Sequence, residues 1–180
     1  MGEGAAPPRG RGQTRGSGGR TRGSGTASVV VIGVGNALRH DDGAGLEVAR
    51  RLRALDGARD LAVREHELET LGLLEAWEGY GAAVIVDAIH SGARAGTLYR
   101  VDASEQAIPT EMRSSSSTHA VDVAGAIELA RALHRLPARV ILHGVEGQRF
   151  DAGSGLSEPV RAAIAPLLEA VLRDARRLSG

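Results

Sequence analysis

The stretch SVVVIGVG, residues 28–35, constrains the fold more than any other part of this sequence. It is a continuous run of apolar, mostly β-branched residues that ends in glycines, and such a run is typical of a strand buried on both faces. A second run of this kind, AAVIVDAI, covers residues 82–89. Because strands buried on both faces need helices on each side, the two runs predict a sheet between two helix layers.

Helical and strand patterns alternate through the rest of the chain. Leu46, Ala49, Leu52 and Leu55 recur at helical spacing, and the predicted helices cover residues 41–55, 70–80, 120–136 and 156–178. Further strands are predicted at residues 61–68, 96–102 and 138–146, with 96–102 nearer an edge. The alternation predicts an α/β fold, a three-layer α/β/α sandwich with a mostly parallel twisted sheet of about five strands. Ser157 is expected to cap the last helix.

Composition limits the domains and partners of the chain. Residues 1–27 are rich in Arg, Gly and Ser, so we predict a disordered tail whose removal leaves fold and activity intact, followed by a single domain over 28–180. The 22 basic and 22 acidic residues balance, which indicates neither a nucleic acid nor a membrane partner. The absence of cysteine excludes disulfides, thiolate metal sites and cysteine nucleophiles. A cytoplasmic monomer is expected.

The turn after the first strand starts like a dinucleotide-binding loop and then departs from it. Gly33 and Gly35 form G-x-G, but Leu38 stands at the third glycine position, and Asp41 and Asp42 follow. Paired carboxylates would repel a phosphate. One aspartate is explained as a helix cap, and the other, about 100° further round the helix, is expected to face the crevice.

Two more polar residues are expected at the same edge of the sheet. Asp87 ends a doubly buried strand with no helix start after it, and His119 precedes a helix after the polar stretch 103–118, a predicted mobile loop. Ligands of such sheets bind outside the carboxyl ends of the strands. Asp42, Asp87 and His119 therefore predict a metal site that suits Ni, Zn, Mn or Fe, in a hydrolase or a binding module.

Four motifs in order resemble those of the [NiFe]-hydrogenase maturation endopeptidases: GVGNALRHDDGAG, VIVDAIHSG, STHAVDVAGAIELA and GLSEPVRAAIAPLLEAVL. The resemblance runs from about Val29 to Leu172. It implies an aspartic-type endopeptidase that activates a hydrogenase by removing the C-terminal extension of the large-subunit precursor after nickel insertion. It also implies that Asp42 and Asp87 are catalytic, and that Asp42, Asp87 and His119 contact nickel. The substrate carries that nickel, so the free enzyme is expected to be metal-free.

One motif differs from the commonest members of that family. Many members carry an aspartate and two glycines after the second strand, whereas this chain reads HELETLGLLEAW, which looks more like the branch that serves soluble or bidirectional hydrogenases. The roles of Glu67, His40 and His90 stay open at this point, as does the group that activates water. Two alternatives also remain, a zinc-dependent peptidase or amidase and a non-catalytic nucleotide-binding module.

Overall fold

The computed structural model describes residues 1–2, 28–67, 70–109 and 123–180. The predicted tail therefore lies outside the described residues apart from Met1 and Gly2, and so does His119. Of the predicted loop 103–118, residues 103–109 are described and contain neither helix nor strand. The rest of that loop lies outside the described part of the chain.

Five strands form one sheet, in the spatial order β2-β1-β3-β5-β4. β4 runs antiparallel to β5 at one edge, and the other neighbouring strands are parallel. This confirms the mostly parallel sheet and the edge position of the fourth strand. The strand bounds are β1 Val29–Val34, β2 Ala62–His66, β3 Ala82–Ile89, β4 Leu98–Asp102 and β5 Arg139–Glu146.

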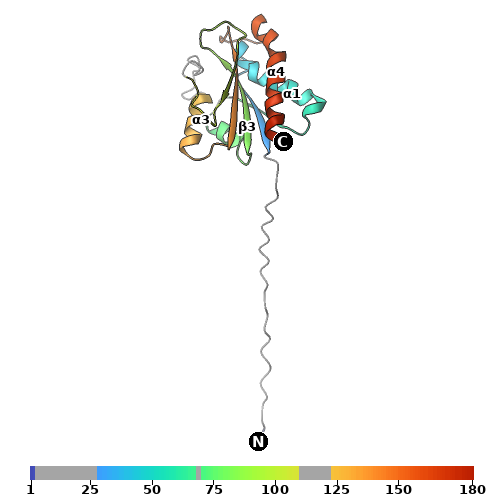
Figure 1. The fold of residues 1–180 in the computed structure, drawn as a ribbon, viewed down its shortest axis with the longest axis vertical. Helices are drawn as coiled ribbons and strands as arrows, with labels where there is room; N and C mark the ends of the chain where they lie inside the picture. The colour runs from blue at the N-terminus through green and yellow to red at the C-terminus, as the bar shows by residue number, and fades with distance from the viewer. Residues whose placement is uncertain (3–27, 68–69, 110–122) are drawn as a thin grey trace.

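Helices cover both faces of this sheet, with α1 and α4 on one side and α3 on the other (Figure 1). The helices are α1 Ala44–Ala54, α2 Thr70–Ala76, α3 Val123–Ala132 and α4 Glu158–Ser179, and short 3-10 turns lie at η1 His40–Gly43 and η2 Asp56–Ala58. Helix α4 continues through Pro166. No helix among the described ranges is long and apolar enough to span a membrane.

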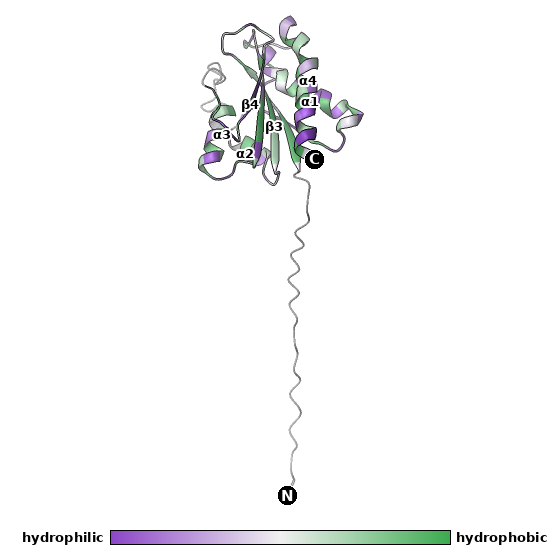
Figure 2. Cartoon of the chain, viewed as in Figure 1, coloured by the Kyte–Doolittle hydropathy of each residue, from purple (hydrophilic) through white to green (hydrophobic). Residues whose placement is uncertain are grey.

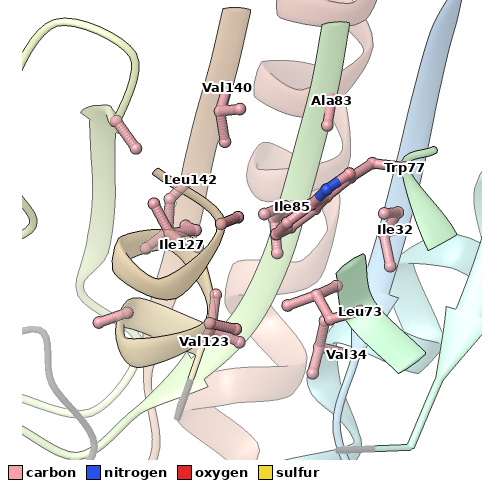
Figure 3. Packing of buried hydrophobic residues seen from close by; sticks show 14 of the residues in the cluster. Ile32, Val34, Leu73, Trp77, Ala83, Ile85, Val123, Ile127, Val140 and Leu142 are labelled. Atoms are coloured by element: carbon pink, nitrogen blue, oxygen red, sulfur yellow. The ribbon is translucent and has the colours of Figure 1, made fainter. Parts of the chain in front are cut away.

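The core lies in two layers, one on each face of the sheet. Alternate residues of β1 point to opposite layers: Val30 and Ile32 pack with α2 and α3, whereas Val29 and Val31 pack with α1 and α4. Figure 3 shows the first layer, in which the Trp77 indole lies over Ile85 of β3. The central strand β3 is accordingly hydrophobic along most of its length, whereas the edge strand β4 and the helices mix polar and apolar residues (Figure 2).

Several helix boundaries differ from the prediction, and α3 ends at Ala132 and not at residue 136. The first helix begins at Ala44 and not at Asp41, because residues 40–43 form the 3-10 turn η1. The predicted helix 70–80 ends at Ala76. Gly79 follows with φ +83°, a backbone conformation that glycine tolerates and that ends helices.

Candidate active site at the carboxyl edge of the sheet

The two predicted site carboxylates lie at the carboxyl edge of the parallel strands. Asp87 is in β3, opposite Gly144 of β5, and is only 7% exposed. Asp42 is in η1, half-buried, and η1 packs against β3. The structure therefore brings a carboxylate from the first turn and one from the central strand to the same edge, as the sequence predicted.

Close backbone packing places the start of α1 directly on the strand ends. A Cβ atom at Gly45 would lie 2.3 Å from the carbonyl oxygens of both Val34 and Val86. Only glycine permits such an approach, because real Cβ atoms do not come so near to a backbone oxygen. The position of η1 over β1 and β3, and with it the position of Asp42, follows from this contact.

The turn between β1 and η1 is equally tight. Gly35 has φ +144°, and a Cβ atom there would lie 1.8 Å from the carbonyl oxygen of Asp42. The Asn36 amide donates to that same oxygen at 3.2 Å, and the Asn36 side chain accepts a hydrogen bond from the Leu38 amide at 2.9 Å. The Asn36 side chain therefore stabilises the turn by a local hydrogen bond. The turn ends in two carboxylates, so it offers no cradle for a phosphate.

Asp41 does not cap the helix that it precedes. Neither η1 nor α1 has a side-chain cap hydrogen bond. The Asp41 carboxylate is fully buried and accepts hydrogen bonds from the amides of Gln148, Arg149 and Ser157, at 2.8, 2.9 and 2.6 Å, and from the Ser157 hydroxyl at 2.8 Å. Capping of its own helix was therefore the wrong interpretation of Asp41: its carboxylate binds the segment that connects β5 to α4.

The pKa of Asp41 reflects these donors. Burial alone would raise the pKa of this carboxyl, since it disfavours the charged form. The hydrogen bonds from Ser157, Gln148 and Arg149 favour the charged form and outweigh burial, so the pKa of Asp41 lies below its ordinary value of 3.8. Asp41 is therefore a buried carboxylate whose negative charge is stabilised by backbone N–H donors.

Segment 147–157, between β5 and α4, binds the η1 turn through its backbone as well. The amides of His40 and Asp41 donate to the carbonyls of Gly153 and Arg149, and Gly153 donates to Leu38. The Arg39 guanidinium donates twice to the Phe150 carbonyl, at 3.1 and 2.8 Å. Segment 147–157 therefore supports the turn that carries Asp42 through several hydrogen bonds.

The His40 side chain also contacts segment 147–157. Its backbone has φ +49°, and its ring nitrogens contact the Gly155 carbonyl at 3.1 Å and the Arg149 guanidinium at 2.9 Å. The ring also fills the space beside Gly153, where a Cβ atom would lie 2.0 Å from Nε2. Both ring nitrogens are thus occupied within the loop, which gives His40 a structural part next to the site.

Glu146 is a buried acid at this edge that sequence analysis missed. It ends β5, is fully buried, and its carboxylate accepts hydrogen bonds from the amides of Ser91, Gly92 and Ala93 at 2.9, 2.9 and 3.2 Å. It therefore fixes the segment that follows β3. The signal that selected Asp87, an acid at the end of a doubly buried strand, applies equally to Glu146.

The remaining candidates surround the same edge. His66 ends β2 beside Val34 and is half-buried, while Glu67 is exposed. His90 is exposed and stacks on Phe150, with ring centroids 5.1 Å apart. Within the part of the chain that the structure describes, no group of three or more His, Cys, Asp or Glu side chains could hold a metal ion. A third ligand beside Asp42 and Asp87 is therefore not found among the described residues, and His119 lies outside them.

The sequence and the fold match known proteins. A family model of the hydrogenase maturation proteases matches residues 68–174, more than half of the 180-residue chain. A putative hydrogenase maturation protease of Methanocaldococcus jannaschii is 27% identical over 154 residues, covering 83% of this chain and 97% of that protein. The hydrogenase 2 maturation protease of Escherichia coli is 27% identical over 150 residues, covering 82% of this chain and 90% of that protein.

Solved structures agree with these relatives. The structure of the hydrogenase-maturating endopeptidase HybD from Escherichia coli superposes with a TM-score of 0.70 at 26% identity, covering 83% of this chain and 93% of HybD. The [NiFe] hydrogenase maturation protease HybD from Thermococcus kodakarensis gives a TM-score of 0.59 at 25% identity, with 82% and 99% covered. The chain therefore belongs to the hydrogenase maturation protease family, and it is a peptidase.

Proposed function

We propose that this peptidase removes the C-terminal extension from the large-subunit precursor of a [NiFe]-hydrogenase, once nickel has been inserted into that subunit. The observation that carries the proposal is the placement of Asp42 and Asp87 at one edge of the sheet, in a member of this protease family. Nickel enters as part of the substrate and not as a resident cofactor of the enzyme.

The chemistry of the two side chains supports this proposal. Carboxylate oxygens are acceptable ligands for a divalent cation. Asp87 is buried, whereas Asp42 is half-buried and can be reached by a bound substrate. We propose His119, which the sequence places before the third long helix, as the third contact to the cation. Two carboxylates and one imidazole leave coordination positions open, which suits a cation that is already held by the substrate.

Hydrolysis of the peptide bond needs a base for water and a stabiliser for the carbonyl oxygen. One of the two carboxylates takes the proton of the attacking water, and the other remains charged toward the cation. The substrate's nickel offers a Lewis acid that polarises a carbonyl oxygen close to it. The enzyme in this scheme supplies carboxylates in a fixed position, and the precursor supplies the cation.

Cleavage of a purified, nickel-loaded large-subunit precursor tests the proposal, with mass spectrometry to locate the cut. Asp42→Asn and Asp87→Asn should each lower the cleavage rate at least about 100-fold, because the amide keeps the shape but loses the basic, charged oxygen. Both variants should melt no lower than the wild type, because neither change opens a cavity. Asp56→Asn is the matched control: its side chain is 89% exposed in η2, and cleavage should not change.

Three results would contradict the proposal. The shared-site part fails if Asp87→Asn cleaves at the wild-type rate. Recognition of substrate nickel fails if the nickel-free precursor is cut equally fast. Stoichiometric zinc in the purified enzyme, with activity lost on chelation and restored by zinc, would instead favour a zinc-dependent peptidase.

A further inference from the structure

The buried carboxylate beside the site suggests a role that goes beyond stability. All donors to Asp41 come from residues more than a hundred positions away in the chain: Ser157 binds Oδ1 through its amide, and Gln148, Arg149 and the Ser157 hydroxyl bind Oδ2. Asp41 therefore links the turn after β1 to the segment after β5.

The start of the turn that carries Asp42 is held by bonds to segment 147–157 and not by local helix caps. Neither η1 nor α1 has a side-chain cap, so the usual local bonds at the start of a helix are missing among these residues. The Asp41 amide donates to the Arg149 carbonyl, so both its backbone and its side chain bind the same segment. Asp42 is the next residue, and its direction follows the placement of η1.

We infer that Asp41 is a positioning residue for peptide cleavage: its buried carboxylate, bound to the amides of 148–149 and Ser157, fixes the orientation of Asp42. The inference rests on the proposed function, in which Asp42 contacts the substrate's cation. A carboxylate suits this place because all four of its partners are donors. An asparagine would turn its own NH₂ group toward at least one of those N–H or O–H donors and leave it unsatisfied.

The observed partners of Asp41 change the activity expected for the Asp41→Asn variant. As a helix cap, Asn is about as good as Asp, so a capping role for Asp41 would predict that Asp41→Asn keeps most of its activity. With the observed partners, the same substitution should displace the η1 turn. Small displacements of a catalytic group cost up to about 100-fold in rate.

The experiment compares Asp41→Asn with a variant that is destabilised elsewhere. Val171→Ala opens a cavity under α4, where Val171 is fully buried, and this position is far along the helix from Ser157, which precedes it. At a temperature where both variants are folded by circular dichroism, kcat on the nickel-loaded precursor should fall at least about 10-fold in Asp41→Asn. The KM for the precursor should change less than about threefold, because the rest of the binding surface is intact. Val171→Ala should keep the wild-type kcat.

A second variant covers the case in which Asp41→Asn does not fold. Ser157→Ala removes the hydroxyl donor and keeps the amide donor, so it should lower kcat less than Asp41→Asn, at unchanged KM. Equal kcat in Ser157→Ala and the wild type would overturn the inference in that case. Equal kcat in a folded Asp41→Asn would overturn it directly.

A readout without substrate separates this inference from the proposed function. The Asn36 amide donates to the Asp42 carbonyl, so its hydrogen exchange reports the placement of Asp42. Exchange at Asn36 should be faster in Asp41→Asn than in Val171→Ala. If the wild type fails to cut the precursor, the proposed function is wrong. Faster exchange at Asn36 in Asp41→Asn would then still support the role of Asp41 in positioning Asp42. Unchanged exchange at Asn36 would contradict that role.

Discussion

Asp41 and Asp174 are both buried carboxylates that bind near helix α4, but at opposite ends of it and with different partners. Asp41 contacts Ser157, the residue before the helix, and its donors are three backbone amides and one hydroxyl. Asp174 lies near the end of α4 and binds side chains only, those of Arg100 in β4, His143 in β5 and Arg177. One carboxylate therefore holds loops together, and the other holds a helix against two strands.

The difference decides what each carboxylate can influence. A group bound to backbone amides fixes the course of the chain, and Asp41 fixes the turn that carries Asp42. A group bound to side chains ties elements that the hydrophobic core already holds in place, because α4 packs on the sheet through Val160, Ile164 and Leu167. We therefore expect changes near Asp41 to affect both stability and cleavage, and changes near Asp174 to affect stability alone.

The largest expected effect comes from the backbone of the turn itself, through Gly35→Ala. The Cβ atom would lie 1.8 Å from the Asp42 carbonyl oxygen, at φ +144°. We expect a loss of about 2–5 kcal/mol in the free energy of unfolding, from left-handed strain of about 1–2 and overpacking of about 1–3 kcal/mol. Urea denaturation followed by circular dichroism measures this loss.

Gly79→Ala is the matched control for that change. Gly79 also has positive φ, at +83°, but a Cβ atom there would meet nothing within 4 Å. The control should lose only the strain contribution, about 1–2 kcal/mol, and should cleave the precursor normally. Equal losses in both variants would show that the contact between the turn and Asp42 contributes nothing.

A smaller effect, on stability alone, is expected for Asp174→Ala. The substitution removes the hydrogen bond to His143 at 2.9 Å and the pair of bonds to Arg100 at 2.7 and 3.1 Å, and it leaves the buried His143 ring without that partner. We expect about 1–3 kcal/mol of destabilisation, with kcat unchanged below the melting transition. A fall in kcat comparable to that of Asp41→Asn would abolish the distinction between the two carboxylates.

The sequence predicted the strands well because both faces of the sheet are covered. Val29–Val34 and Ala82–Ile89 are buried at every position, and runs that are apolar except for Asp87 meet that requirement. Placement of Asp42 and Asp87 at one edge followed from parallel topology. The partners of Asp41 were beyond prediction because they lie 107 to 116 residues away and bind through backbone amides, which leave no pattern in the sequence.

The smallest expected effect is a pH dependence that belongs to the Asp174 region alone. Burial lowers the pKa of His143; the hydrogen bond and charge of Asp174 oppose that shift, and the charges of Arg100 and Arg173 add to it, so the pKa lies below its ordinary value of 6.5. The folded protein thus binds fewer protons than the unfolded chain just below pH 6.5. The free energy of unfolding should therefore fall as the pH drops from 7.5 to 5.5.

His143→Gln tests this sign, because glutamine keeps a donor for Asp174 and does not titrate. Urea unfolding at pH 7.5 and 5.5 should show a smaller decrease in the variant than in the wild type. The donors to Asp41 are backbone amides and a hydroxyl, which do not titrate in this pH range. The pKa of Asp41 is lowered below its ordinary value of 3.8. The contribution of Asp41 to stability should therefore be lost only below pH 3.8, as the carboxylate becomes protonated. An equal decrease in the variant and the wild type would assign the pH dependence to another group and leave the two carboxylate regions alike in this respect.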